Sequence, residues 1–166
     1  MSTIDLGSLL VGLASVPPRQ HSHGARPSPF PSSAFASVSD AASQTPIDLK
    51  EPAYLPGGVR LLDVSVLREP RDLVVMTYED PVRGTSLLMV LSPLDKGAKQ
   101  TQLSVGDAIE EATVGSLPAA LIALAGDRQR NGPGQTTLVW VKGETVYQAI
   151  GVGIARSELQ KVAESI

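Results

Sequence analysis

The chain contains no cysteine, which excludes disulfides, thiolate metal sites, cysteine nucleophiles and a lipidated cysteine anchor. Aromatic residues make up only 4% of its 166 residues, and its two histidines, His21 and His23, lie in a proline-rich stretch. From residue 46 onward there is neither histidine nor cysteine, so a Ser-His-Asp or Cys-His site is impossible there. A His-x-His pair alone is a weak metal site. We therefore expect no metal and no cofactor.

An excess of positive charge is also missing. Lysine and arginine number 14 against 17 aspartate and glutamate residues, which gives a formal net charge of −3 at pH 7. A nucleic-acid-binding protein would carry a concentrated basic face, so we expect no nucleic-acid partner. The hydrophobic fraction of 42% is sufficient for a core and excludes wholesale disorder.

The N-terminal apolar run, residues 6–16, is too short for a membrane-spanning helix, which needs about 20 residues. The only charge before it is Asp5, whereas a signal peptide begins with a basic region. Two interpretations of residues 1–16 stay open. They are a degenerate export or membrane segment, or a segment that packs on a partner or on the body of the protein. Residues 17–36 are rich in proline and predict a solvated linker, which leaves residues 37–166 as the domain.

Short apolar segments separated by turn residues fill most of the domain. The pattern predicts strands at 59–67, 73–78, 85–91, 136–141 and 145–150, and shorter ones at 101–105, 112–114 and 119–125. The run at 119–125 is equally compatible with a buried helical turn. In the first strand we expect Leu62, Val64 and Val66 to share one face. Hairpin-length turns between successive strands indicate an antiparallel meander.

Two helices are expected to flank these strands. Ser37 and Asp40 form a weak capping box for a short helix. At the other end, Leu159 begins an apolar stripe at helical spacing that ends at Ile166, with Ser157 as one candidate N-cap and Gln160 completing a capping box. The predicted fold class is therefore α+β, a twisted antiparallel β-sheet packed against a C-terminal helix and a short N-terminal helix.

Acidic pairs are the remaining candidates for catalysis. Glu110 and Glu111 are adjacent, so in a strand they would point to opposite faces and could not share a site. Glu79 and Asp80 precede Pro81 in an expected turn and are predicted to be solvent-exposed. The loop at 126–134 lacks the Gly-Lys-Ser/Thr ending of a phosphate-binding loop, and solvation is the simpler role for its arginines, Arg128 and Arg130. We expect no enzyme.

The aromatic residues have two interpretations. Trp140 and Tyr147 lie on the two strands of one predicted hairpin, Tyr78 lies on another strand, and Leu159 lies on the last helix. The first interpretation is that these side chains pack in the core. The second is that they line an apolar ligand groove between the sheet and the helix.

Three pieces of the sequence carry a family resemblance: Pro52-x-Tyr54-Leu55-Pro56-x-Gly58, Leu138-x-Trp140 followed by Val146-Tyr147, and Glu158-Leu159-x-Lys161-Val162-Ala163-Glu164-Ser165-Ile166. Over about residues 37–166 their order resembles the domain of unknown function found outside the membrane in bacterial anti-sigma-factor-like proteins and sporulation-type lipoproteins. The resemblance implies a non-catalytic sensing or binding domain outside the cytoplasm. It also implies a build like that of lipoprotein carriers, in which a curved sheet closed by a helix can hold an acyl chain. The zinc-binding module and the lipobox cysteine of such proteins are absent.

The expected function is thus a non-catalytic binding, interaction or sensory domain. It would be tethered through residues 1–36 to a membrane or a protein assembly, with a membrane-associated, periplasmic or cell-surface location expected rather than a cytoplasmic one. The alternative is a carrier of an apolar lipid or acyl ligand in the groove beside Trp140. A carboxylate-dependent hydrolase is the least favoured interpretation.

Overall fold

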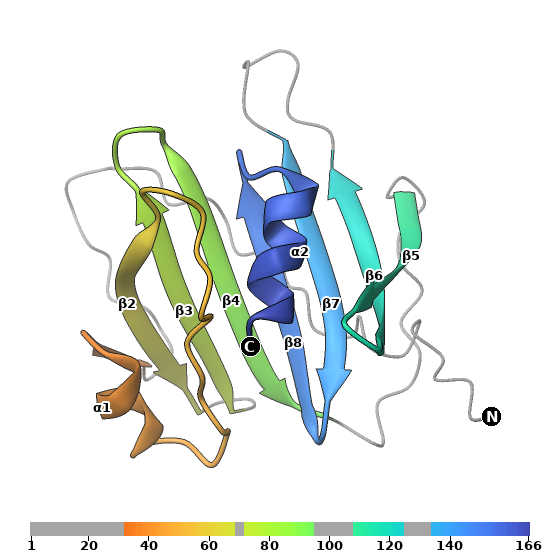
Figure 1. The fold of residues 1–166 in the computed structure, drawn as a ribbon. Coiled ribbons are helices and arrows are strands. Elements are labelled where there is room, and N and C mark those ends of the chain that lie inside the picture. The colour runs from red at the N-terminus through yellow and green to blue at the C-terminus, as the bar shows by residue number, and fades with distance from the viewer. Residues whose placement is uncertain (1–31, 69–71, 95–107, 125–133) are drawn as a thin grey trace.

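The computed structural model describes residues 32–68, 72–94, 108–124 and 134–166. They form an eight-stranded antiparallel sheet with one helix lying across it and a short helix near one edge (Figure 1). The α+β prediction is therefore confirmed. The elements in chain order are β1 (Ser32–Phe35), α1 (Val38–Ala42), β2 (Arg60–Leu67), β3 (Leu73–Asp80), β4 (Thr85–Pro93), β5 (Ala108–Val114), β6 (Leu117–Leu124), β7 (Gln135–Lys142), β8 (Thr145–Val152) and α2 (Arg156–Glu164).

The sheet consists of two meanders joined side by side. The strand order is β1-β2-β3-β4-β8-β7-β6-β5, so each half runs through four strands that are consecutive in the chain. The halves meet where β4 pairs with β8, in a ladder that runs from Ser86 opposite Val152 to Pro93 opposite Thr145. The sequence predicts local hairpins well because they depend on nearby turn residues, whereas this β4–β8 junction depends on contacts far apart in the chain.

The individual strand predictions fare differently. The hairpin around residues 142–144 is confirmed, with Lys142 opposite Thr145 and Gly143 at a φ of 64° in the turn. The run at 119–125 is equally compatible with a helix in sequence, and the structure shows that residues 119–124 belong to strand β6 (Leu117–Leu124), while residue 125 lies outside the described residues. The strand expected at 101–105 lies outside the described residues.

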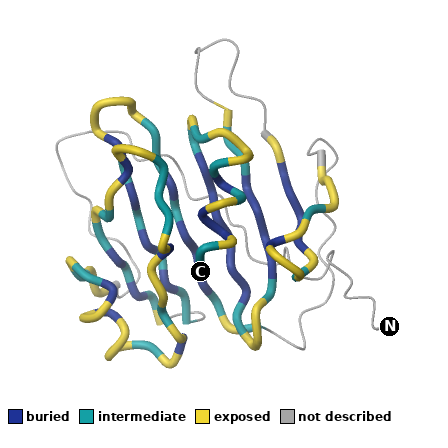
Figure 2. The backbone as a smooth tube through the Cα atoms, in the orientation of Figure 1, coloured by how far each residue is buried: buried dark blue, intermediate teal, exposed yellow. Residues whose placement is uncertain are grey.

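One face of the sheet packs against α2 and forms the main core. Tyr78, Met89, Leu138 and Trp140 point to this face, and Leu159 of α2 packs on them in the same buried cluster. The central strands are the most buried part of the backbone (Figure 2).

In β2 the sequence pattern misplaced one residue. The strand register shifts between Leu61 and Asp63, so Val64 and Val66 reach the core while Leu62 is 53% exposed. Such a bulge inserts a residue that strict alternation cannot foresee. Leu61 packs against the core in the place expected for Leu62.

Of the two predicted helix caps, the one at α1 is confirmed and the one at α2 is wrong. Ser37 is the N-cap of α1, and its Oγ accepts a hydrogen bond from the Asp40 amide at 3.2 Å, as expected. The prediction that Ser157 caps α2 is wrong, because the helix begins at Arg156 after Ala155, which has no capping side chain. Gln160 instead donates a hydrogen bond to the carbonyl oxygen of Thr113 on the edge strand β5.

The expected linker boundary at residue 36 also needs correction. Ser32–Phe35 form β1 and pair with β2, with Phe35 opposite Val64. Phe35 packs against the main core as well, and this burial explains why a segment next to the prolines joins the sheet. Neither helix in the described ranges has the length and apolar run of a membrane-spanning helix.

Candidate functional site

The four residues predicted as a possible groove all lie inside the protein. Trp140, Tyr147, Tyr78 and Leu159 are buried in the main core, and each is at most 5% exposed. Trp140 and Tyr147 sit directly opposite one another on β7 and β8. Their rings stack with centroids 5.3 Å apart and planes 14° from parallel. This stacking places apolar ring surface where a groove would need empty space.

The buried phenols of Tyr78 and Tyr147 lie in surroundings that favour their neutral form. Among the described residues, the hydroxyl of Tyr78 lies 3.6 Å from the sulfur of Met76. Burial raises the pKa of both Tyr78 and Tyr147 above the ordinary phenol value of 10.0. Both side chains therefore stay neutral at physiological pH, which suits core packing.

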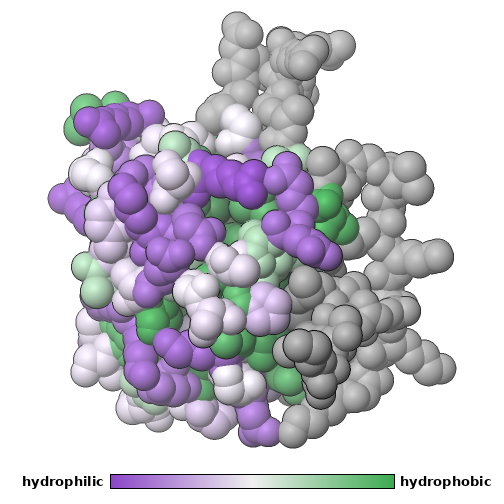
Figure 3. Space-filling view, turned by 45° about the vertical axis from the view of Figure 1, so that its right-hand side comes forward, coloured by the Kyte–Doolittle hydropathy of each residue, from purple (hydrophilic) through white to green (hydrophobic). Residues whose placement is uncertain are grey.

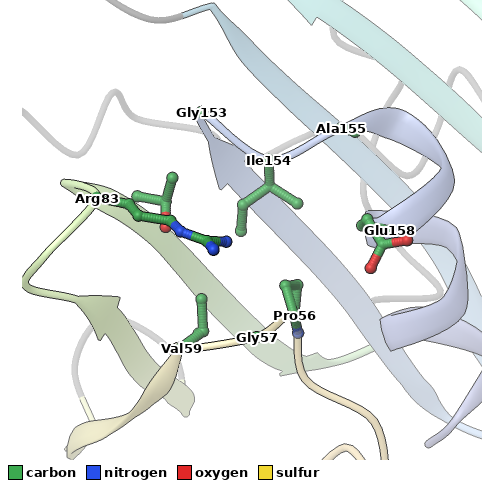
Figure 4. A pocket seen from close by; sticks show the side chains of 9 residues that line it. Pro56, Gly57, Val59, Arg83, Gly153, Ile154, Ala155 and Glu158 are labelled. Carbon is green, nitrogen blue, oxygen red and sulfur yellow. The ribbon is translucent and has the colours of Figure 1, made fainter.

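A shallow pocket of about 290 Å³ opens elsewhere, where the 52–58 segment meets the start of α2 and the β3–β4 turn (Figure 4). Hydrophilic residues predominate on the described surface at this side of the molecule, with apolar residues showing between them (Figure 3). The pocket is lined by Pro56, Gly57, Val59, Arg83, Thr85, Gly153, Ile154, Ala155 and Glu158. None of the four groove candidates is among them, so sequence analysis missed this pocket.

Glu158 is the acidic residue of the pocket, and its carboxylate is already bound on both oxygens. Its Oε2 accepts a hydrogen bond from the hydroxyl of Tyr54, and its Oε1 accepts one from Lys161 Nζ at 2.9 Å. The Tyr54 hydroxyl is the main cause, and Lys161 the next, of a pKa below the ordinary 4.5 for this carboxyl. Glu158 thus remains ionised near neutral pH.

The same contacts attach the 52–58 segment to α2. The amide of Tyr54 donates to Ser165 Oγ at 3.1 Å, and the amide of Ala53 donates to the Ser165 carbonyl at 3.3 Å. The ammonium of Lys161 lies 5.7 Å from the centre of the Tyr54 ring. One wall of the pocket is therefore held in place by several contacts to the helix.

Arg83 stands on the opposite side of the pocket from Glu158 (Figure 4). It belongs to the β3–β4 turn, which the buried carboxylate of Asp80 holds in shape. Asp80 Oδ1 accepts hydrogen bonds from the amides of Val82 at 2.9 Å and Arg83 at 3.2 Å. The Arg83 side chain is 71% exposed, and its Nε lies 3.8 Å from Asp80 Oδ2.

The prediction that Asp80 is solvent-exposed is therefore wrong. It is only 4% exposed because β3 continues to Asp80, and the alternation of the strand turns this side chain toward the α2 face. The Asp-Pro-x-x-Gly pattern of residues 80–84 contained the signal. Aspartate before proline at the start of a turn is typical of a carboxylate that accepts hydrogen bonds from the turn amides.

The other candidates do not meet at this pocket. Glu110 and Glu111 lie on strand β5 and are both exposed, and Glu110 forms an ion pair with Arg156 at 2.6 Å. His21, His23, Arg128 and Arg130 lie outside the described residues. In the described ranges no three histidine, cysteine, aspartate or glutamate side chains are grouped as metal ligands would be.

Comparison of the chain with protein-family models, with curated proteins and with solved structures finds no match. The resemblance to the extracytoplasmic domain of anti-sigma-factor-like proteins therefore stays a prediction from the sequence.

Proposed function

We propose that this protein is a non-catalytic interaction domain working outside the cytoplasm, and that it binds an acidic segment of a partner polypeptide at the pocket between Arg83 and Glu158. The observation that carries the proposal is the placement of Arg83. Its exposed guanidinium projects over a pocket from a turn that buried Asp80 holds rigid. An arginine fork recognises carboxylates through paired hydrogen bonds.

The state of Glu158 supports a binding role over a hydrolytic one. A general acid needs a pKa raised toward neutrality, whereas the pKa of Glu158 is lowered by Tyr54 and Lys161. Both carboxylate oxygens are also occupied by these two side chains. Arg83, on the other side of the pocket, is then the charged side chain that we propose to bind the partner.

The packing around Trp140 bears on the apolar-carrier alternative. A carrier of the predicted kind needs space beside Trp140 and Tyr147, whereas in the described structure these rings stack on one another and belong, with Leu159, to the buried main core, which supports the interaction domain over the carrier. Native mass spectrometry of the purified chain distinguishes the two functions. A co-purified lipid mass would favour the carrier.

The test of the proposed function uses the full chain in its native cells. Chemical cross-linking on intact cells, followed by fractionation, should recover the protein with a partner in an extracytoplasmic or membrane fraction. Arg83→Gln should reduce the recovered complex about tenfold, which is the loss expected for one charge-assisted contact. The matched control is Arg60→Gln, on an exposed arginine of β2. Equal recovery with both variants, or a protein found only in the cytoplasm, would contradict the proposal.

A further inference from the structure

The face of the sheet that points away from α2 carries a second buried area. We call it the second-face patch and define it as the eight buried residues Val90, Ala120, Ile122, Thr137, Val139, Val146, Gln148 and Ile150. They lie on β4, β6, β7 and β8 and alternate along these strands with residues that face α2, such as Trp140 and Ala149. Val139, near the middle, is only 1% exposed.

The described elements do not account for this burial. Val38 of α1, Ile47 of the following segment and Leu159 of α2 all pack into the core on the other face, and Figure 1 shows both helices on that side. Within the described ranges, Leu94 and Val141 are the additional apolar residues packed against the patch, and both are only partly buried. An antiparallel sheet with one bare face normally shows polar, accessible residues there. The patch therefore requires a cover.

Gln148 indicates that the cover is not purely apolar. It lies in a row across four strands, with Val139 and Ala120 on one side and Val90 on the other. The side-chain oxygen of Gln148 is buried and has no hydrogen-bond partner among the described residues. Because buried carbonyl oxygens are nearly always paired, the cover is expected to bring a hydrogen-bond donor to this position.

We propose that residues 6–16 of the same chain form this cover. Leu6, Leu9, Leu10 and Leu13 of this segment follow the i, i+3, i+4, i+7 spacing of an apolar helical stripe, and the serines within the segment supply hydroxyl donors. The other long stretches outside the described ranges, residues 95–107 and 125–133, are mostly polar in sequence. They lack the apolar surface that the patch would bury.

The length of the chain permits this docking. The described part begins at Ser32 in β1, and β8 is four strand positions away in the sheet order, which corresponds to about 19 Å. Residues 17–31 can span up to about 50 Å when extended. A helix over residues 6–16 would be about 16 Å long, comparable to the width of the four strands that carry the patch.

The inference is independent of the partner site at Arg83. Of the two interpretations of the N-terminal segment, it selects the one in which the segment packs on the body of the protein. It also places that segment on a defined face of the sheet. Insertion of the same segment into a membrane would leave the patch without its cover.

Cross-linking of the full chain tests the docking directly, because the protein has no cysteine of its own. Ser15→Cys is combined with Ser92→Cys, which lies on β4 beside the patch, or with Ser157→Cys, which is exposed on α2. Treatment with a short bis-maleimide should link the first pair within one chain and leave the second pair unlinked. Equal linkage of both pairs, or no linkage of either, would overturn the proposal. Linkage of the first pair mainly between two chains would assign the face to a second copy and would also overturn it.

A stability measurement provides an independent second test. Leu10→Asp places a charge in the segment and should release it, lowering the thermal midpoint by roughly 5 °C and increasing the fluorescence of an added hydrophobic dye several-fold. Val82→Asp is the control, because Val82 is 92% exposed in the β3–β4 turn and its replacement should change neither signal. If Leu10→Asp leaves the midpoint and dye binding unchanged while reducing recovery with membranes, the segment is an anchor and the proposal fails.

Discussion

Replacing Gly58 with alanine should destabilise the protein strongly, although only one methyl group is added. Gly58 has a φ of 89°, which an alanine adopts only at a cost of about 1–2 kcal/mol. A Cβ built there would lie 2.5 Å from Asp80 Oδ2 and 3.0 Å from its Cγ. The Asp80 carboxylate must then move away from the amides of Val82 and Arg83, which donate hydrogen bonds to it.

The expected magnitude follows from these two effects. A hydrogen bond to a charged group contributes about 1.5–3 kcal/mol, so losing one of the two amide bonds and adding the backbone strain gives about 3 kcal/mol. With a urea dependence of about 2 kcal/mol per molar for a small domain, the unfolding midpoint should fall by about 1.5 M. Urea titration followed by circular dichroism measures this shift.

The neighbouring glycine provides the control. A Cβ on Gly57 would meet nothing within 4 Å, so Gly57→Ala should change stability by no more than about 0.5 kcal/mol. A double-mutant cycle with Asp80→Ala then isolates the clash. When the carboxylate is removed, the loss of unfolding free energy caused by Gly58→Ala should be smaller by at least about 1 kcal/mol. Equal shifts for Gly57→Ala and Gly58→Ala, or strict additivity with Asp80→Ala, would refute the reasoning.

Three further predictions concern α2. Leu159→Ala, which removes a fully buried side chain from the core, should cost about 2–5 kcal/mol in urea unfolding, against little change for Leu62→Ala at a half-exposed site. Tyr54→Phe should raise the pKa of Glu158 toward 4.5, as read from carboxyl chemical shifts in an NMR titration. Because the folded pKa lies below the unfolded one, the stabilisation from Glu158 is present above pH 4.5 and is lost as the pH falls through the folded value. In the variant the stabilisation should therefore be smaller and its loss should be complete at a higher pH, and identical titrations would show that the Tyr54 contact is absent. Glu110→Gln should change stability by less than about 1 kcal/mol, because both partners of its ion pair with Arg156 are more than half exposed, and a larger loss would mean that this contact holds β5 to the helix.

The strands and the last helix could be predicted because their signals are local. Gly143 marks a hairpin turn, and the spacing from Leu159 to Ala163 marks the buried side of a helix. The bulge at Leu62 was beyond sequence reasoning, since nothing in the residue pattern shows where a strand gains one residue relative to its partner. The strand β1 was hidden for a similar reason, because Ser32–Phe35 join the sheet through pairing with a strand about 30 residues later.

The pocket was harder to predict than the fold. Its lining comes from the 52–58 segment, the β3–β4 turn and the start of α2, which the sequence separates widely. Tyr54 and Glu158 belong to the pieces that carry the family resemblance, yet their contact joins residues 104 positions apart. Arg83 drew no attention because an arginine in a polar turn is ordinarily solvated. Only the burial of Asp80 shows that this turn is held in a fixed shape.

The aromatic residues were ambiguous because composition cannot distinguish a lined groove from a filled interior. The same ambiguity applies to the strands of the second meander. In β7 and β8 the runs from Thr137 to Trp140 and from Val146 to Gly151 are buried at every position, so alternation is lost and the sequence does not show which residues face α2. Continuous burial along a strand means that both faces are covered. Gln148, a polar member of these runs, has a buried side-chain oxygen without a hydrogen-bond partner among the described residues, and this supports our proposal that the second face has a cover of its own.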